Sequence, residues 1–184
     1  EHINAYGVVK DYFDLSQGPL AAAEYNNFSE YKGRLAEDLR YDISSRGITG
    51  TQERYIDFYK KYYSSIEHKK DIEIVDNSAE VQLRENYNIS EFWVDNSEEK
   101  GHFATFYANY ISSMLVDPGS EIRQSPLYIG KRGLYEQFVE ISLQETNWSF
   151  EDESLIIDND VFKFEYNTHY DSETFVLLLE YSFE

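Results

Sequence analysis

Hydrophobic and polar side chains alternate most regularly between residues 79 and 93. Within this run, every second residue from 81 to 89 is hydrophobic except Glu85, and the residues between them are polar. The series consists of Val81, Leu83, Glu85, Tyr87 and Ile89. Because the side chains of a strand point alternately to opposite faces of a sheet, this spacing predicts a strand with one packed face and one solvated face.

The same period of two recurs along the chain and predicts further strands. A short strand followed by a short helix is predicted for 103–115, and the continuous apolar run 175–179 predicts a central strand. The Gly18-Pro19 pair is typical of a turn and favours a hairpin between the first two strands. The further strands are predicted at residues 8–15, 21–30, 72–75, 134–143, 153–157, 161–170 and 174–183.

One segment of the first third has the period of a helix instead. Leu35 and Leu39 lie four residues apart on one helical face, and Gly47 stands where the C terminus of a helix favours a left-handed residue. Thr49 followed by Gln52 has the spacing of a capping box and predicts a second helix. Its tyrosines and phenylalanine recur at helical spacing, so we expect this aromatic face to pack on a sheet.

These elements predict a mainly β (α+β) fold. The expected architecture is a β-sandwich of about ten antiparallel strands with an inserted αα-hairpin at about residues 34–64. A length of 184 residues, of which 41 % are hydrophobic, favours a single domain over residues 1–184, with two small domains as the alternative. The 17 Tyr and 12 Phe, against 9 Gly and 3 Pro, also favour β structure.

The chain is strongly acidic. Its 35 acidic and 16 basic residues give a formal net charge of −19, which repels phosphate backbones and anionic membrane surfaces. We therefore expect no nucleic-acid partner. No apolar run approaches the roughly 20 residues that span a bilayer, so we expect a soluble chain without membrane insertion. The simplest role of the acidic surface is solubility.

Candidate chemistry is sparse. The chain has no cysteine, which excludes disulfides, thiolate metal sites and a cysteine nucleophile within it. The four histidines lack metal-ligand spacing. Asp158 and Asp160 offer the oxygen ligands that calcium prefers, but the calcium-loop pattern is missing and the same residues suit a hairpin turn. We predict no cofactor and no enzymatic activity, with a hydrolase built from Asp and Glu as the remote alternative.

Two tryptophans are the candidate binding residues. Trp93 follows directly on a predicted strand beside Phe92, which places it in the core or at its rim. Trp148 lies between polar residues and is expected to be more exposed. An exposed aromatic ring of this kind can stack on a sugar or a peptide. Trp148 and Trp93 therefore support the hypothesis of a carbohydrate- or peptide-binding or adhesion module.

Several segments carry a resemblance to a known family. These segments resemble the β-rich region that follows the papain-like core of bacterial multidomain transglutaminase-like proteins. The segments, the helix with Leu35 and Leu39, and the last strands of the chain occur in the same order as in that region. The chain resembles this region from about Tyr6 onward. The segments are 84–89, Phe92-Trp93, Phe106-Tyr107 and Pro126-Leu127.

The resemblance implies a domain of unknown function that acts as a non-catalytic accessory or structural unit. Its partner would be an upstream transglutaminase-like domain of the same polypeptide, and its location the periplasm or the cell surface. The catalytic Cys of that core has no counterpart here, so no catalytic residue is carried over. In this role we expect the working surface to be an exposed apolar patch. The start at Glu1, without Met or a signal-like segment, suggests a processed chain or a fragment.

Overall fold

The structure is a computed structural model that describes residues 5–96, 101–115, 132–146 and 148–184. Pro126 and Leu127 of the resemblance lie outside these ranges. The helices are α1 (Arg34–Tyr59) and α2 (Asn109–Met114). The strands are β1 (Ala5–Leu15), β2 (Ala23–Lys32), β3 (Ile66–Asp76), β4 (Glu80–Ile89), β5 (Val94–Asn96), β6 (Gly101–Phe103), β7 (Gly133–Leu143), β8 (Glu153–Asp158), β9 (Lys163–Asp171) and β10 (Val176–Phe183).

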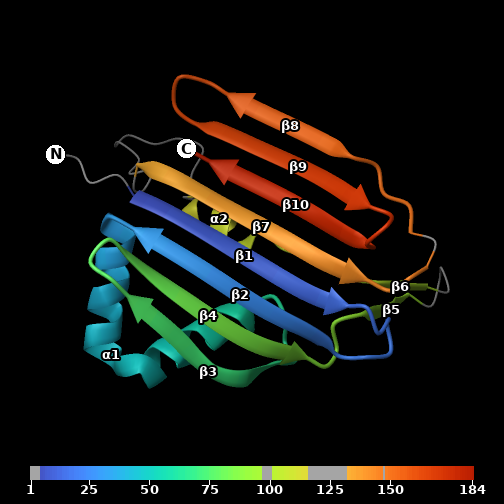
Figure 1. Ribbon diagram of the computed structural model, residues 1–184, viewed down its shortest axis with the longest axis horizontal. Helices are drawn as coiled ribbons and strands as arrows, with labels where there is room; N and C mark the ends of the chain where they lie inside the picture. The colour runs from blue at the N-terminus through green and yellow to red at the C-terminus, as the bar shows by residue number, and fades with distance from the viewer. Residues whose placement is uncertain (1–4, 97–100, 116–131, 147) are drawn as a thin grey trace, which may run out of the picture.

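Eight of the strands form one sheet in the order β3-β4-β2-β1-β7-β10-β9-β8, and β5 and β6 form a separate two-stranded ribbon. Every neighbouring pair in the large sheet is antiparallel except the central pair of β1 and β7, which is parallel. The sheet therefore consists of two antiparallel halves of four strands that meet at one parallel seam (Figure 1).

The predicted β-rich fold, with ten strands and a helical insertion, is confirmed. Its layers differ from the expected sandwich, because helices rather than a second large sheet cover one face, and the β1–β7 pair is not antiparallel. The physical reason is that a period-two alternation shows only that one face of a strand is packed. It does not distinguish packing against helices from packing against a second sheet. Figure 1 shows α1 and α2 behind the sheet and the opposite face open toward the viewer.

The helical insertion consists of two segments joined at Gly47. This residue has φ 74° and ψ 174°, a conformation that glycine adopts without steric penalty and that breaks the helix. The expected capping box is absent at this break, because the side-chain oxygen of Gln52 instead accepts a hydrogen bond from the backbone N–H of Ile72 at 3.0 Å. Gln52 thereby ties the second segment to β3. Within the described residues, no helix is long and apolar enough to cross a membrane.

An aromatic ladder runs across four strands beneath the second segment of α1. Phe13, Tyr25 and Tyr87 are neighbours in register, and their rings stack with centroids 4.5 and 5.5 Å apart. His68 extends the row at 5.1 Å from Tyr87. Tyr59 meets both Tyr25 and Tyr87 at 5.3 Å in edge-to-face geometry. The prediction that the helical aromatic face packs on a sheet is thus confirmed.

Gly7 is a position where the helical layer approaches the sheet closely. A Cβ atom on Gly7 would lie 1.9 Å from the hydroxyl of Tyr110 in α2 and 3.0 Å from the Leu35 side chain. We expect Gly7→Ala to lower the free energy of unfolding by about 1–3 kcal/mol, because the buried Tyr110 ring must move. The midpoint of urea denaturation measures this loss. The matched control is Gly101→Ala, where no atom lies within 4 Å, and an equal loss in both variants would contradict the argument.

Candidate functional site

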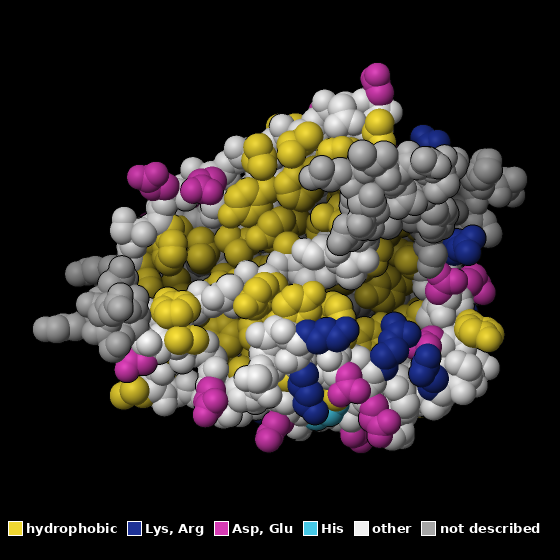
Figure 2. Space-filling view, turned by 180° about the vertical axis from the view of Figure 1, so that it is seen from behind, with side chains coloured by type: hydrophobic (Ala, Val, Ile, Leu, Met, Phe, Trp, Pro, Cys, Tyr) yellow, Lys and Arg dark blue, Asp and Glu magenta, His cyan; other side chains and the backbone are white. Residues whose placement is uncertain are grey.

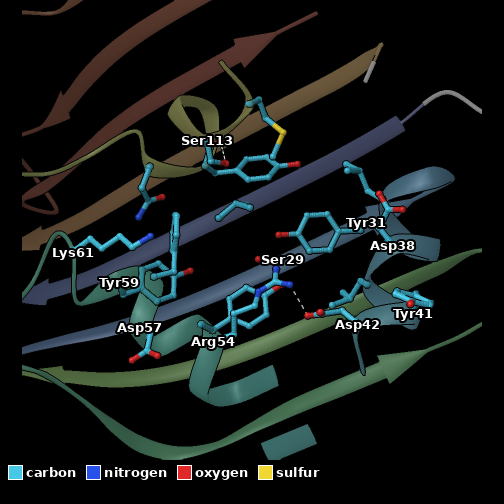
Figure 3. Close-up of a pocket in the computed structure, with 18 residues that line it drawn as sticks. Ser29, Tyr31, Asp38, Tyr41, Asp42, Arg54, Asp57, Tyr59, Lys61 and Ser113 are labelled. Carbon is cyan, nitrogen blue, oxygen red and sulfur yellow. Dashed lines mark hydrogen bonds and ion pairs between the residues drawn. The ribbon is translucent and has the colours of Figure 1, made fainter. Parts of the chain in front are cut away.

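A cavity of about 530 Å³ lies between the two segments of α1 and α2, above β1 and β2 (Figure 3). Aromatic side chains contribute a third of its lining residues, because the helical segments present their inward faces to the same stretch of sheet. The cavity is open to solvent on one side. Its aromatic lining consists of Tyr31, Tyr41, Tyr55, Phe58, Tyr59 and Tyr110.

Uncharged polar groups converge on the same cavity from two elements. Ser29 comes from β2, and Asn109 and Ser113 come from α2. Tyr110 is only 7 % exposed, and its buried hydroxyl has no hydrogen-bond partner among the described residues. Burial raises the pKa of Tyr31 to about 12, so this hydroxyl keeps its proton and remains a donor at neutral pH. The wall therefore combines apolar ring faces with several hydroxyl and amide groups.

A charged cluster stands at the open side of the cavity. Asp42, on the first segment of α1, pairs with Arg46 at 2.7 Å and with Arg54, on the second segment, at 2.5 Å. The Arg54 pair thus bridges the two segments across the Gly47 break, as the dashed line in Figure 3 shows. Lys61 extends toward the cavity in that view, whereas Asp57 points away from it.

Beneath the cavity, polar side chains replace hydrophobic ones on the packed face of the sheet. Asp11, Asn27 and Glu85 are neighbours in register on β1, β2 and β4, and each is only 2 % exposed. Asp11 accepts hydrogen bonds from the Tyr25 hydroxyl at 2.7 Å and from the Asn27 amide at 2.8 Å. Ser29, in turn, donates to Asn27 at 2.8 Å. These bonds offset part of the cost of burying polar groups.

Gln137 connects this polar row to the second half of the sheet and to α2. Its amide nitrogen donates to Asp11 at 2.6 Å across the parallel seam and to the Asn109 side chain at 3.0 Å. Its carbonyl oxygen accepts from the backbone N–H groups of Tyr110 and Ile111 at 3.1 and 3.3 Å. One side chain therefore positions α2, which forms one wall of the cavity.

Glu85 is the least compensated member of the polar row. It accepts a hydrogen bond from the Tyr87 hydroxyl, but its other carboxylate oxygen has no partner among the described residues. Burial raises the pKa of Glu85 to about 8, and the nearby Asp11 adds to this shift while the Tyr87 bond opposes it. Glu85 therefore holds its proton at neutral pH. The carboxylic acid form removes the cost of a buried charge.

The two tryptophans predicted as binding residues lie together, away from the cavity lining. The rings of Trp93 and Trp148 are 6.4 Å apart at an interplanar angle of 20°, and Trp148 lies equally flat against Phe150 at 6.0 Å. The Trp148 indole N–H donates to the Gln144 carbonyl at 2.8 Å. Both tryptophans pack on the main core, so stacking and packing already use much of their ring surface. A binding role for Trp93 and Trp148 stays a prediction.

Asp158 and Asp160 lie at the turn between β8 and β9. Asn159 between them organises this turn, because its side-chain oxygen accepts from the backbone N–H groups of Val161 and Phe162 at 2.8 and 3.2 Å. The hairpin interpretation of this segment agrees with the pairing of β8 and β9. In the described ranges, no group of three or more His, Asp or Glu side chains is placed to hold a metal ion.

Sequence patterns did not point to the cavity, although one signal was present. Glu85 occupies a packed position in the most regular alternation of the chain, and Asp11 and Gln137 do the same in β1 and β7. A charged or amide side chain in a packed series indicates a buried polar network. The cavity itself depends on the approach of α2 to α1, which no local pattern encodes.

The raised pKa of Glu85 predicts a pH-dependent stability. In the unfolded chain this carboxyl titrates near its ordinary pKa of 4.5, while in the folded protein it keeps its proton up to about pH 8. Stability is therefore greatest below pH 4.5 with respect to this group and falls as pH rises to 8, by at most about 1.4 kcal/mol per pH unit.

Glu85→Gln removes the titrating group while it preserves the shape of the acid form. We expect this variant to have a flatter stability profile between pH 5 and 8, and to be more stable than the parent at pH 8.5. Urea denaturation at each pH measures the effect. The control is Glu91→Gln, at an exposed carboxylate. A slope as steep in Glu85→Gln as in the parent would refute the assignment.

Comparisons of the chain with models of protein families, with curated proteins and with solved structures find no match. The relation to transglutaminase-like proteins therefore stays a prediction from the residues that carry the resemblance. The assignment of a candidate site depends on the geometry of the chain itself, and that geometry singles out the tyrosine-lined cavity above the buried polar row.

Proposed function

We propose that this chain is a non-catalytic binding domain and that the cavity between α1 and α2 holds its ligand. The observation that carries the proposal is the combination of a preformed hollow of about 530 Å³, a wall of tyrosine rings and convergent polar groups. Small-molecule sites are typically concave, of about 300–1,000 Å³, mostly apolar and fitted with a few polar groups that fix orientation. This cavity has each of those properties.

The lining favours a polar ligand with flat or extended apolar parts. Tyrosine rings offer faces for stacking, and their hydroxyls together with Ser29, Asn109 and Ser113 offer donors and acceptors. A short oligosaccharide or a short peptide fits this chemistry.

The wider role that we propose is that of an accessory domain beside an upstream transglutaminase-like core, in an extracytoplasmic protein. The resemblance supports this role, since Tyr87, Phe92 and Phe106 of its motifs pack within one core. A second support is a hydrophobic area on the helix side of the C-terminal half of the sheet that the described helices leave open (Figure 2). Such an area suits contact with a neighbouring domain.

A cavity-filling variant tests the binding site. Ser113 lies on the exposed side of α2 at the cavity, so Ser113→Trp fills the hollow without replacing a core residue. We expect oligosaccharides or peptides from a defined panel to shift the backbone amide NMR signals of Ser29, Tyr59 and Ser113. The affinity of such a ligand should fall roughly tenfold or more in Ser113→Trp, because the indole clashes with the occupied site.

The matched control is Ser112→Trp, at an exposed position of the same helix that does not line the cavity. This variant should bind as the parent does, and so should Trp148→Ala. Loss of binding in Trp148→Ala with retention in Ser113→Trp would move the site to the stacked tryptophans. If no member of the panel shifts signals at the cavity, the proposed binding function is wrong.

The accessory role makes a separate prediction about the coding region upstream of Glu1. Sequencing that region should reveal a papain-like core with Cys, His and Asp in catalytic order. An upstream signal peptide followed directly by this domain, or by repeats of it, would contradict the accessory role and favour a free-standing binding module. The outcome does not depend on the cavity experiment, so the two parts of the proposal can fail separately.

A further inference from the structure

The outer strand β8 is an unprotected edge of the large sheet. It pairs with β9 on one side, and no described strand or helix lies along its other side (Figure 1). All six of its residues are exposed, and its centre is apolar: Leu155 is 49 % exposed, Ile156 61 % and Ile157 42 %. An exposed, apolar edge of this kind is a ready template for another strand.

The backbone groups available at this edge follow from the hydrogen bonds of β9. Lys163 exchanges two backbone hydrogen bonds with Glu184, both of 2.9 Å, so its N–H and C=O point toward β10. Because successive residues of a strand point their backbone groups to opposite sides, those of Phe164 point toward β8, where Phe164 is paired with Ile157. The N–H and C=O groups of Ile156, and by the same alternation of Ser154 and Asp158, therefore point outward.

The opposite edge of the sheet is protected. β3 carries two register shifts, between His68 and Lys70 and between Lys70 and Glu73, and each shift interrupts the regular ladder. Charged side chains also occupy much of this strand, including Lys69, which pairs with Glu24 at 2.6 Å. Bulges and charges are the usual means by which an edge avoids pairing. The centre of β8 has neither.

The acidic residues around β8 define what can pair with it. Glu153 and Asp158 are its two ends, and Glu151, Asp152 and Asp160 lie just beyond them. A second copy paired antiparallel through its outward-pointing residues and centred on Leu155 would place Asp152 of one chain opposite Asp158 of the other, and centring on Ile156 would place Asp152 opposite Asp160. Like charges directly opposite each other destabilise a strand pair. Self-pairing is therefore disfavoured, whereas basic residues at the ends of a partner strand would be attracted.

We propose that β8 is a docking edge for an extended segment of a partner chain that is apolar at its centre and basic at both ends. The segment would add a ninth strand to the eight-stranded sheet, with backbone hydrogen bonds to Ser154, Ile156 and Asp158. Its apolar side chains would lie beside Leu155 and Ile157, which the strand registers place on the same face as the packed residues of β7. Figure 2 shows a hydrophobic area on this helix side of the sheet. This edge is separate from the cavity, so the inference does not depend on the proposed ligand.

The probe is a synthetic, fluorescently labelled peptide with the sequence Lys-Lys-Thr-Val-Ile-Val-Thr-Lys-Lys. We expect it to bind the parent chain and to slow amide hydrogen exchange at Ser154, Ile156 and Asp158. Ile156→Pro removes one outward N–H while the bonds of Leu155 and Ile157 to β9 remain. The affinity should fall about tenfold or more, which corresponds to about 1.4 kcal/mol.

A second variant keeps the test decisive if Ile156→Pro unfolds the hairpin. Ile156→Lys places a cation at the centre of the edge and should also weaken binding about tenfold. Its control is Val161→Lys, which adds the same charge at a position that is 70 % exposed in the adjoining turn. Val161→Lys should reduce affinity far less than Ile156→Lys.

Three outcomes would overturn the proposal. The first is equal affinity of the parent and a folded Ile156→Pro variant for the lysine-flanked peptide. The second is equal affinity of the parent for a peptide in which glutamates replace the four lysines, since this would remove the argument from charge. The third is a concentration-dependent dimer of the parent, seen by analytical ultracentrifugation, that Ile156→Pro abolishes, because the occupant would then be a second copy.

Discussion

The hydrogen bond between Gln137 and Asp11 is the interaction on which the rest of the structure depends. It crosses the parallel seam of the sheet, where β1 and β7 meet. Asp11 also accepts hydrogen bonds from two side chains of β2, and the Gln137 carbonyl oxygen accepts hydrogen bonds from the backbone N–H groups of Tyr110 and Ile111 in α2. A buried polar group that loses its partner costs about 1–3 kcal/mol, so a shift of either strand would leave several groups unpaired at once. Register, helix position and cavity wall are therefore coupled.

Two tyrosines cover this polar row in a way that no other residue type could. A tyrosine ring buries a large apolar area while its hydroxyl bonds to a polar neighbour. Tyr25 and Tyr87 use both properties, since their rings stack with each other while their hydroxyls donate to Asp11 and Glu85. Phenylalanine would give the stacking and leave the carboxyl groups of Asp11 and Glu85 without these donors. Tyr59, which packs edge-to-face on both rings, is one of the tyrosines that line the cavity.

Local pattern was sufficient for most of the strands and for the helices, though not for β5, and it did not identify the partners of the strands. The alternation that contains Val81 and Tyr87 identified β4, and Gly47 marked the break within α1. The pairing of β1 with β7 joins residues more than a hundred positions apart, and period two is the same whether helices or a second sheet cover a strand. For the site, Glu85 in a packed series was the available signal, while the approach of α2 to α1 depends on Gly7 and Gln137, whose roles appear only in three dimensions.

The acidic composition has a structural consequence beyond solubility. The open eight-stranded sheet has two outer strands, β3 and β8, and this chain protects them by different means. At β3, register shifts and mixed charges interrupt the ladder. At β8 the ladder is regular and its centre apolar, and the carboxylates at its ends oppose pairing with an identical strand. Such protection discriminates by charge rather than by shape, so it excludes copies of the chain while leaving the edge open to a strand of opposite charge.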